Sequence, residues 1–160
     1  MKFLFVCLGN ICRSPAAEGI LRTMIQRIGI PNVDVDSAGT YGGHDGEKPD
    51  PRMLRAAAKR GYVLEHSARE IRTEDFEEFD KIFVMDDSNY DDVMRLAPDT
   101  QSQEKVERIT KYCTRYKVDH VPDPYYNKRE GFDEVLDILE DACEGIVENM
   151  YAIYKSSKKI

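Results

Sequence analysis

The hexapeptide KFLFVC at residues 2–7, apolar after Lys2, leads into the loop LGNICRS at residues 8–14 and then into PAAEGILRTMIQRI at residues 15–28. The hexapeptide is too short to cross a membrane and has the composition of a buried strand. Apolar residues then recur at helical spacing until Gly29 ends the pattern. Ser14 is the predicted N-cap of this helix and Pro15 its first residue. The N-terminal quarter of the sequence therefore predicts a strand, a tight loop and a helix.

The rest of the chain continues this alternation. Further strands are predicted at 33–36, 81–85 and 106–109, and further helices at 50–60, 88–96 and 132–150. Strands separated by helices are typical of a parallel sheet that is covered on both faces. Because no repeat or flexible linker divides the sequence, residues 1–160 are expected to form a single α/β domain. Such folds bind ligands beyond the carboxyl ends of their strands, which points to the loop after residue 7.

Composition argues against several classes of function. The net charge is −7, and the basic residues cluster only at the tail, so no nucleic-acid partner is expected. Four cysteines and three histidines show no metal-ligand spacing, so neither a metal nor another cofactor is expected. No segment has the pattern of a signal peptide or a membrane span. The protein is therefore expected to be cytoplasmic, with no membrane partner and with reduced cysteines.

The loop after residue 7 has the parts needed to bind phosphate. Its successive N–H groups can converge on an anion, and the helix that follows adds a positive N-terminus. Gly9 and Asn10 tolerate the positive φ angles that such a wrap requires. Arg13 offers a planar fork for two phosphate oxygens. The same field should lower the pKa of Cys7 and make it a nucleophilic thiolate, to which Ser14 can donate a hydrogen bond.

A cysteine followed six positions later by arginine is by itself a weak pattern. Here it is confined to Cys7 and Arg13, because the other cysteines have Glu18, Asp119 and Asn149 at that position. Its place between a strand and a helix makes a purely structural role for these two residues the less favoured interpretation. The loop also lacks the lysine followed by serine or threonine that a nucleotide-binding P-loop contains.

The loop contains no acid that could protonate a leaving oxygen. A phenol has a pKa of about 10, so a phenolate leaves poorly unless it is protonated. Asp123, in the segment VPDPYY at residues 121–126, is the best candidate because two prolines stiffen its backbone. Tyr125 and Tyr126 could form an aromatic wall for a substrate ring. On these residues alone, a structural Pro-Asp-Pro turn explains the segment equally well.

Four motifs together resemble the low-molecular-weight protein tyrosine phosphatases: CLGNICRSP at 7–15, DSAGT at 36–40, HSAR at 66–69 and DPYY at 123–126. The resemblance covers essentially the whole chain. It implies a four-stranded parallel sheet flanked by helices on both faces, with the phosphate-binding loop after the first strand. It also implies metal-free hydrolysis of phosphotyrosine in proteins or peptides, and of small aryl phosphates, through a phosphocysteine intermediate that releases phosphate.

The resemblance also assigns roles to residues. It implies that Cys7 is the nucleophile, Arg13 binds phosphate, and Asp123 acts first as general acid and then as base for the attacking water. The rest of the phosphate-binding loop is then Leu8, Gly9, Asn10, Ile11, Cys12 and Ser14. Ser37 and His66 match a hydrogen-bond network that supports this loop. We expect the protein to be a monomer.

The sequence departs from the family on one wall of the cleft. Many relatives carry a tryptophan on the loop after the second strand, whereas this chain contains none and reads YGGH at residues 41–44. Tyr41 is expected to form the substrate wall with Tyr125 and Tyr126, and His44 is a second candidate for the missing ring. Substrate preference therefore stays open.

Three other functions fit the same loop. An arsenate reductase of this fold needs two further cysteines close together, but Cys113 and Cys143 are thirty positions apart. Related phosphoarginine phosphatases carry threonine where this chain has Ile11, whose apolar side chain suits an aromatic ring better. A non-catalytic phosphate-binding module would not need a nucleophile and an acid as well.

Cys12 has two interpretations. The low pKa expected of Cys7 also makes that thiol the most easily oxidised, and Cys12 is the nearest thiol in the sequence that could capture it as a disulfide. Alternatively, Cys12 is a small buried side chain that fills the floor of the loop.

Overall fold

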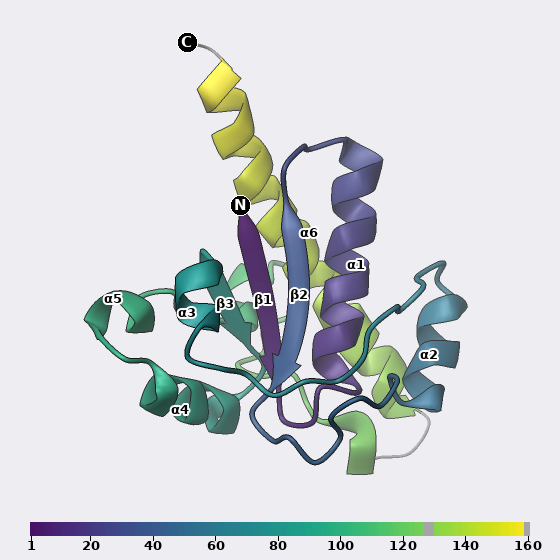
Figure 1. Cartoon of the computed structure of the whole chain (residues 1–160). Helices are drawn as coiled ribbons and strands as arrows, with labels where there is room; N and C mark the ends of the chain where they lie inside the picture. The colour runs from purple at the N-terminus through teal and green to yellow at the C-terminus, as the bar shows by residue number, and fades with distance from the viewer. Residues whose placement is uncertain (127–129, 159–160) are drawn as a thin grey trace.

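The structure is a computed structural model that describes residues 1–126 and 130–158, without the side chains of Tyr126, Glu130 and Lys158 (Figure 1). Its strands are β1 (Lys2–Cys7), β2 (Asp34–Gly39), β3 (Lys81–Val84) and β4 (Val106–Arg108). Its α-helices are α1 (Arg13–Ile28), α2 (Pro51–Ala58), α3 (Asp75–Glu78), α4 (Asp87–Leu96), α5 (Thr100–Gln103) and α6 (Glu130–Lys158). Two 3-10 turns, η1 (Ile109–Tyr112) and η2 (Pro124–Tyr126), complete the list. No helix in the described part of the chain is both long and apolar enough to cross a bilayer.

The four strands form one parallel sheet in the order β2-β1-β3-β4, which confirms the predicted fold class. The central strand β1 pairs on one side with β2, with Cys7 opposite Gly39, and on the other side with β3. Because the chain leaves β1 toward one neighbour and returns later to the other, the strand order switches at this strand. The carboxyl ends of β1 and β3 therefore lie side by side at the edge where ligands are expected.

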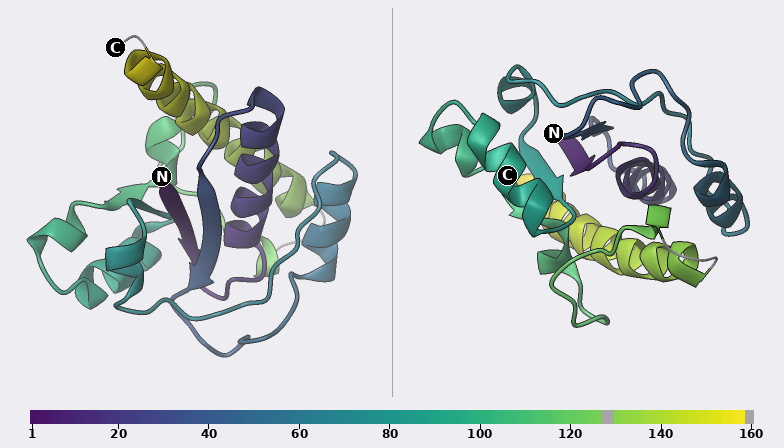
Figure 2. Two further views of the ribbon diagram at one scale, coloured as in Figure 1. Left: turned by 45° about the horizontal axis from the view of Figure 1, so that its top comes forward. Right: turned by 90° about the horizontal axis from the view of Figure 1, so that it is seen from below.

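Helices cover both faces of the sheet (Figure 2). Successive side chains of a strand point to opposite faces, and β1 follows this rule. Phe3 and Phe5 pack in the core beneath α1 and α6, whereas Leu4 and Val6 pack in a second core with residues of α3 and α4. The continuous apolar run at residues 3–6 is thus explained by a strand buried on both sides.

The last helix is longer than the apolar stripe that predicted it. The stripe from Phe132 to Met150 is buried, but α6 spans 29 residues and its final turns carry the exposed Tyr151 and Ile153. These turns project beyond the end of the sheet (Figure 1). A hydrophobic pattern predicts the part of a helix that packs on a core, but it does not predict how far the helix continues into solvent.

Some local predictions were wrong. Helix α1 begins at Arg13, its N-cap is Cys12, and no side chain caps it, so Ser14 lies inside the first turn instead of capping it. Strand β2 runs on from the predicted end at residue 36 to Gly39, which places Ser37 within the sheet. The four-residue helices α3 and α5 were not predicted, because one turn is too short to show a period.

Candidate active site

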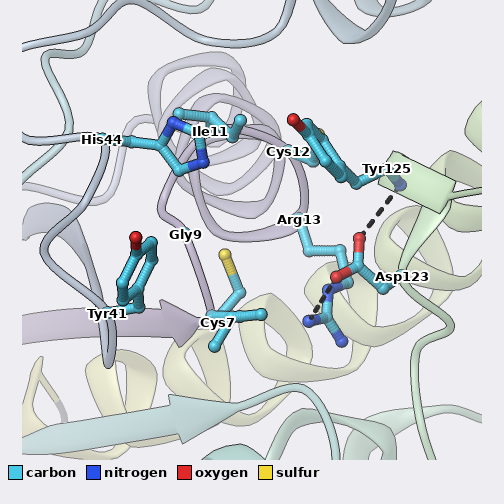
Figure 3. A pocket seen from close by; sticks show the side chains of 10 residues that line it. Cys7, Gly9, Ile11, Cys12, Arg13, Tyr41, His44, Asp123 and Tyr125 are labelled. Carbon is cyan, nitrogen blue, oxygen red and sulfur yellow. Dashed lines mark hydrogen bonds and ion pairs between the residues drawn. The ribbon is translucent and has the colours of Figure 1, made fainter.

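A pocket of about 90 Å³ opens at the carboxyl end of β1 (Figure 3). It brings together the three residues for which chemical roles were predicted, Cys7, Arg13 and Asp123, from two segments that lie more than 100 positions apart in the sequence. The other residues that line the pocket come from the loop, from the segment after β2 and from η2: Leu8, Gly9, Ile11, Cys12, Tyr41, His44 and Tyr125.

One residue in the loop adopts a left-handed backbone conformation. Asn10 has a φ of 58°, as predicted, whereas Gly9 is not among the residues with positive φ, so that part of the prediction was wrong. Gly9 instead provides space, because a Cβ atom there would lie 3.0 Å from Cδ2 of His44. Gly39 does the same beneath the loop, where a Cβ atom would lie 2.7 Å from the carbonyl oxygen of Leu8. The loop is therefore packed tightly against the end of β2.

A hydrogen-bond chain fixes the polar surroundings of Cys7. The backbone N–H of Arg69 donates to Oδ1 of Asn10 (2.9 Å), so the amide nitrogen of Asn10 is the end that faces Ser14. That nitrogen donates to Oγ of Ser14 (2.8 Å), and this leaves the Ser14 hydroxyl to donate its own proton elsewhere. Its nearest acceptor is Sγ of Cys7, at 3.0 Å, with the carbonyl of Ala38 farther away at 3.4 Å.

The same chain continues below the loop. Nε2 of His66 lies 2.7 Å from Oδ1 of Asn10, and the hydroxyl of Ser37 accepts from the Asn10 amide nitrogen (3.0 Å). Both His66 and Ser37 also reach the buried Glu18, at 3.2 and 2.8 Å. Burial alone would raise the pKa of Glu18, but these hydrogen bonds, together with the charges of His66 and Arg22, hold it below its ordinary value. The loop thus rests on a buried carboxylate.

Glu18 was not predicted as part of the site. The available signal was its position, because Glu18 lies four residues after Ser14 and therefore shares one face of α1 with it. The other residues of this network, Ser37 and His66, were predicted from the resemblance, and the structure brings both to the loop.

The described residues contain one group that could hold a metal ion: Glu18, Asp36 and His66, whose ligand atoms lie within 4.8 Å of one another. These atoms already bond to protein groups, because His66 reaches Glu18 and Asp36 pairs with Arg69 (3.0 Å). Glu18 and His66 belong to the network that supports the loop, and none of the three residues lines the pocket.

Arg13 is held rigidly, with only 2% of its side chain exposed. Its Nη1 donates to Oδ2 of Asp86 (2.7 Å) and to the carbonyl of Val121 (2.9 Å), and its Nη2 lies 3.5 Å from Oδ2 of Asp123. No described residue accepts a hydrogen bond from its Nε. One edge of the guanidinium is thus anchored in protein through Nη1, and the edge formed by Nε and Nη2, which Asp123 approaches only to 3.5 Å, can bind a ligand.

Asp86, the anchor of Arg13, was also missed by the sequence analysis. It lies two positions after the end of β3, caps α4 by accepting from the backbone N–H of Asn89 (2.8 Å), and uses its other oxygen for Arg13. The available signal was topological: β3 neighbours β1, so the residues after both strands meet at one edge.

The segment with Asp123 closes the pocket from the other side. The backbone N–H of Val121 donates to the carbonyl of Met85 (2.8 Å), which ties the segment to the end of β3. Oδ1 of Asp123 accepts from the backbone N–H of Tyr125 (3.0 Å), and Oδ2 faces Arg13 (Figure 3). The Asp123 side chain is 26% exposed, so solvent and substrate can reach it.

Three rings surround the mouth of the pocket. His44 lies between Tyr41 and Tyr125, with ring centroids 6.2 and 6.1 Å away, and its Nδ1 lies 2.5 Å from Oε2 of Glu47. Tyr41 and Tyr125, the residues expected to form a substrate wall, are 57% and 41% exposed, and both line the pocket. The side chain of Tyr126, predicted as part of the same wall, lies outside the described residues.

The four cysteines differ in their access to the pocket. Cys7 and Cys12 line it, Cys143 is fully buried under α1, and all four are free thiols in this structure. Burial, followed by the nearby charge of Asp50, raises the pKa of Cys12 far above its ordinary value. Neither Cys113 nor Cys143 reaches the pocket.

Comparison with known proteins identifies the family. Residues 2–156 match the family described as low molecular weight phosphotyrosine protein phosphatase. The low molecular weight protein-tyrosine-phosphatase of Streptomyces coelicolor is 40% identical over 149 residues, which cover 91% of each chain. The crystal structure of a protein tyrosine phosphatase from Entamoeba histolytica superposes with a TM-score of 0.92 and 43% identity, over 95% of this chain and 97% of that one.

A second structure bears on substrate choice. The crystal structure of a Drosophila arginine phosphatase superposes with a TM-score of 0.88 and 31% identity, over 94% of this chain and 98% of that one. The same fold is therefore found in proteins whose names give different phosphorylated residues. By sequence, by fold and by the arrangement of its pocket, the chain belongs to the low molecular weight phosphotyrosine protein phosphatases, a family of cysteine-dependent hydrolases.

Proposed function

We propose that Cys7, Arg13 and Asp123 hydrolyse phosphotyrosine through a phosphocysteine intermediate. The observation that carries this proposal is their convergence on one small pocket, with the thiol of Cys7 at its base and Asp123 beside the guanidinium of Arg13. In the first step the Cys7 thiolate attacks phosphorus, and the bond from phosphorus to the phenolic oxygen breaks. The hydroxyl of Ser14, 3.0 Å away, can stabilise the thiolate before attack and after its release.

Arg13 and the loop bind the phosphoryl group. Charge on the transferred oxygens is met by the N–H groups of residues 8–13 and by the N-terminus of α1. The Nε–Nη2 edge of Arg13 offers two parallel hydrogen bonds, while Asp86 and Val121 hold the opposite edge. Such pre-set donors stabilise the transition state without reorganisation.

Asp123 then serves both halves of the reaction. As an acid it gives its proton to the departing phenolate, which becomes a neutral phenol. As a carboxylate it takes a proton from the water that attacks the phosphocysteine, which releases inorganic phosphate and restores Cys7. Its partial exposure allows both the leaving group and the attacking water to reach it.

Phosphotyrosine is the substrate that the mouth of the pocket favours. The rings of Tyr41, His44 and Tyr125 and the side chain of Ile11 surround the opening and can pack against a phenyl group. Phosphoarginine is the second candidate, because the similar Drosophila protein is named an arginine phosphatase. Arsenate reduction is disfavoured, since Cys113 and Cys143 do not reach the pocket.

The deciding experiment compares turnover of peptides that contain phosphotyrosine, phosphoserine or phosphoarginine, with chelator and without added metal. We expect phosphotyrosine to be hydrolysed fastest. Faster hydrolysis of phosphoarginine would assign the chain to the second substrate class, and binding without turnover would make it a phosphate-binding module.

We also propose that the protein acts as a monomer in the cytoplasm on phosphotyrosine-containing proteins. The described part of the chain offers no membrane-spanning helix, and the net charge of −7 disfavours a nucleic-acid partner. Light scattering after size-exclusion chromatography tests the monomer, since a dimer would double the mass.

A further inference from the structure

Arg52, in the first turn of α2, is joined to the phosphate-binding loop through Asp50. Its Nε and Nη2 donate to the two carboxylate oxygens of Asp50 at 3.1 and 2.8 Å, in a bidentate pair. The backbone N–H of Asp50 in turn donates to the carbonyl of Ile11 at 2.8 Å. One end of the Arg52 side chain is thus fixed relative to the residues that wrap phosphate.

The same guanidinium also reaches the segment that carries the acid. Nη2 of Arg52 donates to the carbonyl of Tyr125 at 3.3 Å, and the guanidinium carbon lies 5.7 Å from the centre of the Tyr125 ring. The ring of Phe132 in α6 lies 4.9 Å from the same carbon. The guanidinium therefore contacts two aromatic rings from different elements, an arrangement that suits a flat cation.

Tyr125 is the residue through which this contact reaches Asp123. Its carbonyl accepts from Arg52, and its backbone N–H donates to Oδ1 of Asp123 at 3.0 Å. A shift of Tyr125 would therefore carry the Asp123 carboxyl with it. A general acid must lie within hydrogen-bond reach of the leaving oxygen, and small misplacements are costly.

We propose that Arg52 is a positioning residue that sets Asp123 against the phosphate-binding loop by clamping Tyr125 to Asp50. This inference rests on the proposed role of Asp123 as general acid. Helix α2 does not need the clamp for its own start, because Oδ1 of Asp50 already caps it by accepting from the backbone N–H of Arg52. The guanidinium adds the link to η2 and α6.

The test uses two aryl phosphates that differ in how much proton donation they need. Phenyl phosphate releases a phenol of pKa about 10, whereas p-nitrophenyl phosphate releases a more acidic phenol, which needs less proton donation to leave. The kcat/KM value reports the steps up to phenol release. Wild type, Arg52→Ala, Arg52→Lys, Asp123→Asn and the double variant Arg52→Ala/Asp123→Asn are compared on both.

We expect Arg52→Ala to lower kcat/KM for phenyl phosphate by about tenfold or more, against less than threefold for p-nitrophenyl phosphate. In the Asp123→Asn background the same substitution should cost less than about twofold, because the acid that it positions is already gone. Arg52→Lys should fall between, since an ammonium keeps the charge but loses the fork and the flat contact. Thermal melts show whether each variant is folded.

Arg55→Ala is the matched control. Arg55 lies one turn farther along α2, is exposed, and has no hydrogen bond or ion pair with any described residue. Removal of this arginine should leave kcat/KM for both substrates within about twofold of wild type, whereas a general effect of positive charge on α2 would lower both alike.

Two different failures can be told apart. If Arg52→Ala lowers kcat/KM equally for both substrates, and by the same factor in the Asp123→Asn background, Arg52 does not position the acid, while Asp123 keeps its role. If Asp123→Asn itself shows no dependence on the leaving group, the proposed acid is wrong and the positioning role falls with it. Should Arg52→Ala fail to fold, the same pattern is required of Arg52→Lys.

Discussion

Residues 7–14 wrap the phosphate pocket and are mostly buried, whereas residues 121–126 carry Asp123 to the same pocket along a partly exposed path. The first segment is fixed from beneath, where Asn10 and Ser14 join a network that ends on the buried Glu18. The second is fixed at its start by a backbone hydrogen bond from Val121 to Met85, just after β3, and near its end by Arg52.

The chemistry of the two segments explains this difference. The loop must hold many N–H donors pointed at one anion. Because this arrangement has to be fixed before the substrate binds, buried groups support the loop. The acid must exchange protons with a phenol and then with water, which requires an approach from solvent. We therefore expect damage to the loop to affect every substrate, and damage to the acid segment to depend on the leaving group.

The largest effect is expected for Cys7→Ser, which should abolish hydrolysis of all aryl phosphates. A serine hydroxyl is not ionised near neutral pH, and the hydrogen-bond partner of the Cys7 side chain among the described residues is the hydroxyl of Ser14, which is not a base. Release of phenol and of phosphate should both be measured. Substantial activity of this variant on any aryl phosphate would remove the central claim, whereas retained binding of phosphate would confirm that the loop is intact.

The next effect is expected for Arg13→Lys, at about 10³-fold or more in kcat/KM. The lysine ammonium group cannot make two parallel hydrogen bonds to phosphate. In addition, Asp86 and Val121, which accept hydrogen bonds from Arg13, lose their partner. Because the loss lies in the loop, it should be the same for phenyl and p-nitrophenyl phosphate. If only the kcat/KM value for phenyl phosphate fell, Arg13 would act on proton donation by Asp123 and not on phosphate binding.

Asp123→Asn should lower kcat/KM for phosphotyrosine peptides and phenyl phosphate by about 10²–10⁴, the usual range for general acid catalysis. Asparagine retains the shape of the side chain but has no proton of suitable acidity. The loss should shrink for p-nitrophenyl phosphate, whose leaving group needs less help. Equal losses on both substrates would show that another group supplies the proton.

The same two segments show what could be read from the sequence. Cys7 and Arg13 lie close together in the chain, and their strand-loop-helix setting left a local pattern. Asp123 had a local pattern that fitted an ordinary turn equally well, and only the resemblance to a family decided its role. Glu18 had only its position one turn after Ser14 as a signal, and Asp86 had only a topological one, because each acts through a partner that the fold brings near.

The error at Ser14 has a physical reason. Serine before proline is a common start of a helix, and it predicts a hydroxyl that satisfies a free N–H of the first turn. In this loop the free N–H groups of α1 are the ones proposed to bind phosphate, so no side chain caps them. The hydroxyl of Ser14 is used by Cys7 and Asn10 instead. A functional site thus overrode the local rule.

A smaller effect is expected for Ile11→Thr, which should shift relative activity from phosphotyrosine toward phosphoarginine by several-fold. Ile11 lines the pocket, and its apolar side chain offers a guanidinium no hydrogen bond. A threonine hydroxyl would offer the guanidinium a hydrogen bond, and the smaller threonine side chain would pack less well against an aromatic ring. The ratio of kcat/KM for matched phosphotyrosine and phosphoarginine peptides is the measurement. An unchanged ratio, or a wild type that already prefers phosphoarginine, would refute the role of Ile11.

The smallest effect on basal rate is expected for Cys12→Ser, which instead tests recovery from oxidation. Peroxide converts the Cys7 thiolate to a sulfenic acid, and attack by the thiol of Cys12 would form a disulfide and release water. Cys12 is buried next to the pocket, and burial raises its pKa, so it is a neutral thiol until the loop moves. A Cys7–Cys12 disulfide would be inactive but could be reduced by added thiol.

Each protein is therefore treated with peroxide and then with thiol reductant, and its recovered activity is divided by its own starting activity. Wild type should regain most of its activity, whereas Cys12→Ser should stay inactive, because its sulfenic acid proceeds to irreversible sulfinic acid. Cys113→Ser serves as the control, since that thiol does not line the pocket, and it should recover like wild type. If Cys12→Ser recovers equally well, Cys12 only packs beneath the loop and does not protect Cys7.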